Sequence, residues 1–158
     1  DKKNLWRSLS KYLAHSSTTS SIALTPLETL AKTNIIDKLA LPKTCLLVED
    51  DVDSAQLMSL LLAKLNVKTT QAKDGQSCIS LLENKNFWDL ILIDIGLPDI
   101  NGLDLVKKLN ELNIQGEIII LSGEEPDKSV LASLKIKTSL LKPVSMEMLK
   151  KLMSNLMI

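Results

Sequence analysis

Five short apolar runs alternate with five segments of helical periodicity between Lys43 and Ile158, and this alternation constrains the fold most strongly. The predicted strands cover residues 44–48, 67–72, 89–93, 117–121 and 139–141. The predicted helices cover residues 53–65, 74–84, 102–112, 127–134 and 145–157. The runs CLLV and LILI are apolar throughout, which is typical of central parallel strands covered by helices on both faces. The alternation predicts an α/β protein with a doubly wound parallel sheet.

Short polar side chains mark the starts of four predicted helices. At each start a side-chain oxygen can accept hydrogen bonds from the free backbone N–H groups of the first turn, and the residues are Asp53, Asp74, Asp127 and Ser145. Because strand–helix–strand crossovers are right-handed, the first and third strands are expected side by side at the centre of the sheet. We therefore predict a flavodoxin-like (βα)5 fold with the strand order 2-1-3-4-5.

The first part of the chain follows a different pattern. Residues 1–14 are predicted to form an amphipathic helix, and residues 15–42 a linker that contains SSTTSS near its start. The first helix aligns with the predicted last helix, with Leu5 over Leu149. Two amphipathic helices often align this well, so an unrelated helix and the closing helix of a preceding copy of the domain both stay open. Since the chain starts at Asp1 and not at methionine, we expect it to be part of a longer protein.

The charges of the chain balance, with 19 Lys and Arg residues against 19 Asp and Glu residues. Such a balance predicts no general attraction to nucleic acid or to an anionic membrane. The apolar runs are far shorter than the ~20 residues needed to span a bilayer, and no signal peptide opens the sequence, so a cytoplasmic protein is expected. Cys45 and Cys78 lie in apolar patterns and are expected as buried, reduced thiols, and His15 has no partner at metal-ligand spacing.

Polar residues follow four of the predicted strands at the point where each strand ends. Glu49 and Asp50 follow the first strand, and Asp94 follows the third. Ser122 comes after the fourth strand and Lys142 after the fifth. Each residue alone is commonly a solvated turn residue or a helix cap. Because parallel strands open onto one edge of a sheet, their joint placement favours a shared site.

The residue types at this edge indicate a specific chemistry. Carboxylates held within ~4 Å of one another repel by about 4 kcal/mol per pair at an effective dielectric constant near 20, so they need a cation. Hard oxygen ligands without His or Cys select Mg²⁺ or Mn²⁺ over zinc. A lysine and a hydroxyl can each bind a phosphoryl oxygen. The set therefore describes a phosphoryl group carried on a carboxylate, with Asp94 as the nucleophile.

Residues 43–158 resemble the receiver domain of the two-component, or phosphorelay, response-regulator family in the motifs LLVEDD, LIDIGLPDINGLDL, IIILSG and LLKPV. The resemblance implies that Asp94 accepts a phosphoryl group from a histidine of a sensor histidine kinase or of a histidine phosphotransfer protein. It further implies that Asp50 and Asp94 bind Mg²⁺ (or Mn²⁺) directly, that Glu49 acts through water, and that the backbone carbonyl of Gly96 completes the ligand set.

The resemblance also implies roles for residues that touch no metal. Ser122 matches the hydroxyl that moves to meet the phosphoryl oxygen, and Lys142 matches the family lysine, whose peptide bond to Pro143 is expected to be cis. Pro98 and Gly102 match the turn that follows the phosphoacceptor. A phosphorylated receiver of this kind transfers and hydrolyses its own phosphoryl group, so we expect no enzyme of ordinary turnover.

Three positions depart from the family pattern. Gly96 stands where a bulky residue is usual, so water is expected to reach the phosphorylated site easily and to shorten its lifetime. Ser139 occupies the position of the aromatic residue that normally rotates when the switch hydroxyl moves. The usual Gly-Ala pair is missing from LASLKIKTSL, so we expect the helix at 127–134 and the loop after it to be short or atypical.

Two other functions remain as alternatives to phosphotransfer. A pseudo-receiver keeps the fold as a protein-interaction module without being phosphorylated, but packing alone does not require an acidic pair, a hydroxyl and a lysine at one edge. An aspartate-nucleophile phosphatase needs a second aspartate two residues after the nucleophile, where this chain has Gly96.

The surrounding sequence suggests the kind of parent protein. We expect a receiver at the C-terminal end of a hybrid sensor kinase or of a tandem-receiver regulator, with a free-standing regulator less favoured. The segment carries no basic helix-turn-helix motif, so direct binding to nucleic acid is not expected, and neither is contact with a membrane. If the parent is a membrane-bound sensor kinase, this is its cytosolic part, and a homodimer stays open.

Overall fold

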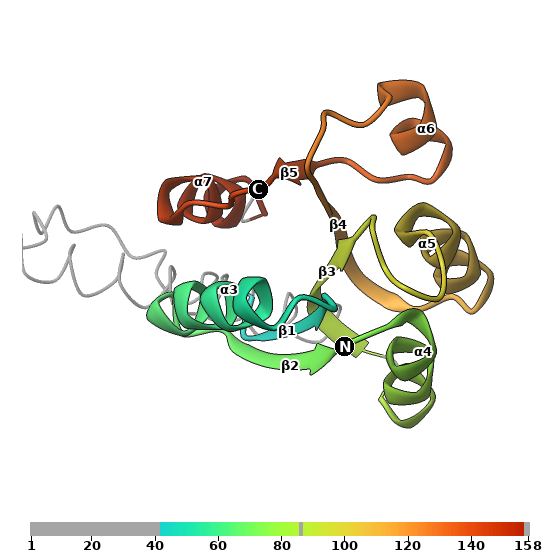
Figure 1. The fold of residues 1–158 in the computed structure, drawn as a ribbon, viewed down its shortest axis with the longest axis horizontal. Helices are drawn as coiled ribbons and strands as arrows, with labels where there is room; N and C mark the ends of the chain where they lie inside the picture. The colour runs from blue at the N-terminus through green and yellow to red at the C-terminus, as the bar shows by residue number, and fades with distance from the viewer. Residues whose placement is uncertain (1–41, 86, 157–158) are drawn as a thin grey trace, which may run out of the picture. The chain divides into compact units, whose positions relative to one another are not determined.

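The computed structural model describes residues 42–85 and 87–156. The helix predicted for residues 1–14 lies outside this range, as does the linker predicted for 15–42 apart from its last residue. The described residues form a five-stranded parallel sheet in the order β2-β1-β3-β4-β5, which confirms the predicted fold and order (Figure 1). The strands are β1 (Thr44–Val48), β2 (Lys68–Ala72), β3 (Phe87–Asp94), β4 (Gln115–Ser122) and β5 (Ser139–Leu141).

Five helices accompany the strands, and their observed ends lie within one residue of the predicted ones. They are α3 (Val52–Lys64), α4 (Gly75–Asn84), α5 (Gly102–Glu111), α6 (Lys128–Ser133) and α7 (Met146–Leu156). With six residues, α6 is the shortest helix of the described part, as expected from the missing Gly-Ala pair. Within residues 42–85 and 87–156, no helix combines the length and the apolar character that a membrane crossing requires.

The helix caps agree with the sequence at all but one of the predicted positions. The side chains of Asp74 and Asp127 accept hydrogen bonds at the starts of α4 and α6, and Ser145 Oγ accepts one from the Met148 N–H at the start of α7. The prediction for α3 is wrong, because Asp51 caps this helix by accepting the Ser54 N–H, and Asp53 lies in the first turn.

Alternate residues of the central strands pack into two separate apolar cores. One core lies between the sheet and the helices α4, α5 and α6, and the other between the sheet and α3 and α7 (Figure 1). The first core takes Leu46, Ile91 and Ile93, whose side chains are fully buried. Burying one such side chain contributes about 1.5–3 kcal/mol. The central strands are therefore fixed from both faces, which sets where the loops that follow them begin.

The pairing of the strands brings their carboxyl ends level with one another. Val48 pairs with Ile93, which puts the residues after β1 beside the end of β3. Asp94 pairs with Leu121, and on the other side of β4 Ser122 pairs with Leu141. The acidic residues, the hydroxyl and the lysine predicted to share one edge therefore emerge at the same height of the sheet.

Both cysteines are buried and unpaired, as expected, and burial raises the pKa of each thiol from 9.0 to about 12. We predict that a thiol-reactive disulfide reagent leaves the folded protein unmodified near neutral pH and titrates both thiols once the protein is denatured. Fast labelling without denaturant would contradict the burial. Because the unfolded chain loses these protons first, the thiols' contribution to stability falls as the pH rises above 9.0.

Candidate functional site

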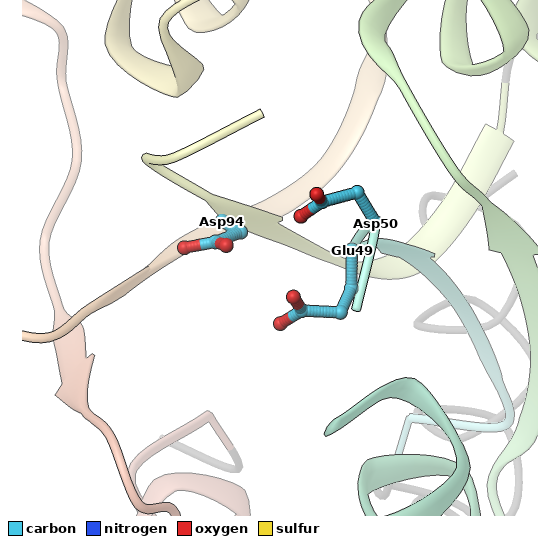
Figure 2. A group of neighbouring side chains, drawn as sticks. All are labelled: Glu49, Asp50 and Asp94. Atoms are coloured by element: carbon cyan, nitrogen blue, oxygen red, sulfur yellow. The ribbon is translucent and has the colours of Figure 1, made fainter. Parts of the chain in front are cut away.

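A lysine and three carboxyl groups meet at the carboxyl edge of the sheet. Lys142 Nζ lies 2.6 Å from Glu49 Oε2 and 2.9 Å from Asp94 Oδ2. Glu49 is 2% exposed and Asp94 is 9% exposed, whereas Asp50 is open to solvent. Figure 2 shows that Glu49 and Asp50 leave the end of β1 on neighbouring positions and that Asp94 leaves the adjacent end of β3. Four of the residues that the sequence predicted to lie together therefore do so at this edge, namely Glu49, Asp50, Asp94 and Lys142.

The three carboxyl groups are close enough to share one cation. One oxygen from each of Glu49, Asp50 and Asp94 lies within 4.8 Å of the others. All of the donors are hard oxygens, which suits Mg²⁺ or Mn²⁺. Gly96 lies two residues beyond Asp94, and a Cβ atom added there would be 3.8 Å from Asp94 Oδ2, so its backbone also borders the cluster. These residues fit a divalent cation that keeps part of its water shell.

Neighbouring backbone groups hold Glu49 in place. Its N–H donates to the carbonyl of Ala72 on β2, and its carbonyl accepts a hydrogen bond from Gln71 Nε2 at 3.2 Å. The carboxylate also accepts the Asp51 N–H through Oε1, at 3.3 Å. Sequence reasoning missed Gln71. The one signal was its position next to the end of β2, the strand that pairs with β1.

Burial and pairing act in opposite directions on the charges of this cluster. Burial raises the pKa of Glu49, and the nearby Asp94 raises it further, against the hydrogen bond from Lys142. Burial lowers the pKa of Lys142, but its hydrogen bonds to Glu49 and Asp94 outweigh that effect and leave the pKa above 10.5. The lysine is therefore a cation at neutral pH. Its contribution to stability is present below pH 10.5 and is lost as the pH rises through its folded-state pKa.

Ser122 is close to the cluster, but its hydroxyl is bonded elsewhere. The residue is 6% exposed, and its Oγ donates to the carbonyl of Glu124 at 2.5 Å while accepting the Glu124 N–H at 3.2 Å. A cavity of about 540 Å³ is bordered by Asp94, Gly96, Ser122 and Lys142. In this conformation the hydroxyl is therefore held by the β4–α6 loop and adjoins the space beside Asp94.

Three further predicted positions lie around the site. Ser139 is the first residue of β5, is half-buried and pairs with Ile120, and it is absent from the cavity lining. The peptide bond between Lys142 and Pro143 is cis, as expected. A Cβ atom at Gly102 would overlap the backbone of Asp94, so glycine is needed here for a close approach of two chain segments.

Comparison with known proteins gives a consistent match. The family model described as response regulator receiver domain matches residues 45–154. The autoinducer 1 sensor kinase/phosphatase LuxN of Vibrio campbellii is 31% identical over 113 residues, which are 71% of this chain and 13% of that protein. The two-component response regulator ARR10 of Arabidopsis thaliana is 31% identical over 119 residues, covering 73% of this chain and 21% of that protein. The chain thus spans less than a quarter of either relative.

Solved structures match a similar share of the chain. The receiver domain of the Francisella response regulator 1452 is 31% identical with a TM-score of 0.63, covering 73% of this chain and 96% of that one. A CheY-like receiver domain from Methylobacillus flagellatus is 25% identical with a TM-score of 0.66, covering 72% of this chain and 98% of that one.

Proposed function

Because this chain belongs to the response regulator receiver domain family, we propose that it accepts a phosphoryl group on Asp94 and passes a signal on in that state. The observation that carries the proposal is the shared ion pair of Lys142 with Glu49 and Asp94, which places a fixed cation beside a nearly buried carboxylate. Packing does not require such a group, because replacing a buried ion pair by apolar side chains of similar volume is often neutral or stabilising.

The geometry supports a direct attack by Asp94. Lys142 contacts Oδ2, so we assign the attack on the phosphorus atom to the other carboxylate oxygen. An O–P bond forms, the P–N bond to the donor histidine breaks, and the imidazole leaves with the electron pair of that bond. Lys142 then neutralises a phosphoryl oxygen, and Ser122 reaches another by exchanging its hydrogen bond to Glu124.

Glu49, Asp50, Asp94 and the backbone of Gly96 would hold the divalent cation. When bound, Mg²⁺ or Mn²⁺ supplies charge that offsets the carboxylates and the phosphoryl oxygens. Glu49 stays fixed through its backbone bonds to β2, and the solvent exposure of Asp50 leaves that side open to a hydrated ion.

The proposed donor is a histidine of a sensor kinase or of a phosphotransfer protein. The similarity to the sensor kinase/phosphatase LuxN supports a hybrid kinase as one parent, and the similarity to ARR10 supports a response regulator as another. We propose the first, with the phosphoryl group passing from Asp94 to a further histidine, and the 31% identity to LuxN over 113 residues is consistent with it.

Incubation with acetyl phosphate tests the proposal without a known kinase. We expect the intact mass to rise by one phosphoryl group in the presence of Mg²⁺ and to stay unchanged when a chelator replaces the metal. A folded protein that never takes up the group would overturn phosphotransfer and favour the pseudo-receiver.

Gly96 is expected to shorten the life of the phosphorylated state. A Cβ atom at this position meets only Asp94 Oδ2, at 3.8 Å, so a larger side chain fits and would cover the path of an attacking water. We predict that Gly96→Met slows the loss of the phosphoryl group about threefold, which corresponds to about 0.6 kcal/mol of barrier. The decay of the intact-mass adduct after donor removal measures this in both proteins. Equal decay in wild type and Gly96→Met, or a wild-type lifetime of many hours, would contradict the role of Gly96.

A further inference from the structure

The loop between β3 and α5, residues 95–101, is tied to the start of a helix far away in the sequence. The Asp99 carboxylate accepts the Gly75 N–H through Oδ1 at 2.9 Å and the Gln76 N–H through Oδ2 at 3.0 Å. Both donors lie in the first turn of α4, where backbone N–H groups have no partner inside the helix and a negative charge is favoured. Asp99 therefore bridges this loop to α4 with both oxygens.

The contact is tight as well as polar. Gly75 is buried, and a Cβ atom there would overlap the Cγ2 methyl of Ile100. The same added atom would lie 3.3 Å from Asp99 Oδ2. The absence of a side chain at Gly75 thus lets two consecutive loop residues lie against the end of the helix.

The ends of the loop are fixed separately. The Ile95 N–H donates to the carbonyl of Leu121 on β4 at 3.1 Å, and the Gly102 N–H donates to the carbonyl of Ile95 at 2.9 Å. Gly96 lies between these bonds and the bridge made by Asp99. Three attachments therefore restrain a short segment that starts directly after Asp94.

We infer that Asp99 is a positioning residue that holds the β3–α5 loop so that the Gly96 carbonyl faces the divalent cation. The inference rests on the proposed function, because it assumes that Gly96 contributes to the metal site. Asp99 acts through the backbone and touches neither the cation nor the phosphoryl group.

Helix α4 supplies a matched control. Asp74 caps the same helix by accepting the Ser77 N–H at 2.7 Å, and among the described residues it makes no hydrogen bond to the loop. Asp74→Ala and Asp99→Ala each remove a carboxylate from one helix end, so a purely structural role predicts the same outcome for both. The two variants differ because only Asp99→Ala removes the hydrogen bonds between the β3–α5 loop and α4.

The test measures Mn²⁺ binding to the full chain through the electron paramagnetic resonance signal of the free ion, together with denaturant unfolding. We expect both variants to unfold at lower denaturant, with Asp99→Ala binding Mn²⁺ about 10-fold more weakly than wild type. Asp74→Ala should bind like wild type. If Asp99→Ala fails to fold, Asp99→Asn replaces it, keeping one accepting oxygen and giving a smaller loss in the same direction.

The possible results separate this inference from the proposed function. Wild-type affinity in the Asp99 variants, or an equal loss in the Asp74 variant, overturns the positioning role and leaves phosphotransfer standing. A wild-type protein that binds no Mn²⁺ overturns the metal site and the positioning role together.

Discussion

Asp94→Asn is expected to abolish phosphorylation while leaving the protein folded. The amide keeps the shape of the side chain and its contact distance to Lys142, but it is a poor nucleophile. We expect the rate of phosphoryl uptake from acetyl phosphate to fall by at least about 10³-fold, which intact mass spectrometry reads as no adduct. The unfolding midpoint should stay close to that of wild type, because the substitution also relieves repulsion between Asp94 and Glu49.

Asp89 gives the control for this substitution on the same strand. It lies near the opposite end of β3, where Oδ2 accepts hydrogen bonds from the Lys43 N–H, the Thr44 N–H and Thr44 Oγ1. Asp89→Asn should lower the unfolding midpoint and keep full phosphorylation. If Asp94→Asn still gained a phosphoryl group at the wild-type rate, Asp94 would not be the nucleophile.

Lys142→Met is expected to lower the free energy of unfolding and to slow phosphorylation. Removing the ammonium leaves the charges of Glu49 and Asp94 without their common partner, and Glu49 is 2% exposed. Breaking such a pair from one side costs about 2–4 kcal/mol, allowing for the partial exposure of the lysine. Since the proposed function places this cation against the phosphoryl group, we expect its loss to slow phosphoryl uptake by about 10²-fold. Urea unfolding and the rate of adduct formation measure the two effects.

The pH dependence of this variant gives a second check. Because burial raises the pKa of Glu49 above 4.5, the folded state binds this proton more tightly than the unfolded state. Because Lys142 lowers this pKa in the wild type, its removal raises the pKa further, so the variant gains more stability than the wild type as the pH falls towards 4.5 and its deficit in unfolding free energy should narrow.

Lys137 is the matched control for the lysine. It also forms an ion pair, with Glu117 at 3.6 Å, but its side chain is 78% exposed. Lys137→Met should leave stability within about 0.5 kcal/mol and phosphorylation unchanged, as for most exposed pairs. Equal effects of the two substitutions would show that Lys142 contributes no more to stability or to phosphorylation than an exposed lysine.

The strand ends and the residues that follow them could be predicted because both depend on short-range patterns. The apolar run LILI and the acid after it set the place of Asp94, and parallel topology then brings it to Glu49 and Lys142. The cap of α3 was missed by two residues, since Asp51 and Asp53 are equally good caps in sequence and only the backbone bend selects between them.

Two features of the site depend on contacts that no local pattern encodes. Ser122 was placed correctly at the edge, but its bond to Glu124 depends on the path of the β4–α6 loop. The bridge from Asp99 to Gly75 joins segments separated by more than twenty positions, and it requires both a helix start and a loop at a fixed distance. Such contacts follow from tertiary packing, which a single sequence does not reveal.

The identity of the phosphorylated residue is the most direct test of the central claim. Borohydride reduces an aspartyl phosphate to homoserine with release of phosphate, and peptide mass spectrometry then locates the changed residue. We predict that wild-type protein treated with acetyl phosphate and Mg²⁺ carries this change at Asp94 alone. A change at Asp50 or Glu49 in its place, or no change in folded protein, would contradict the account.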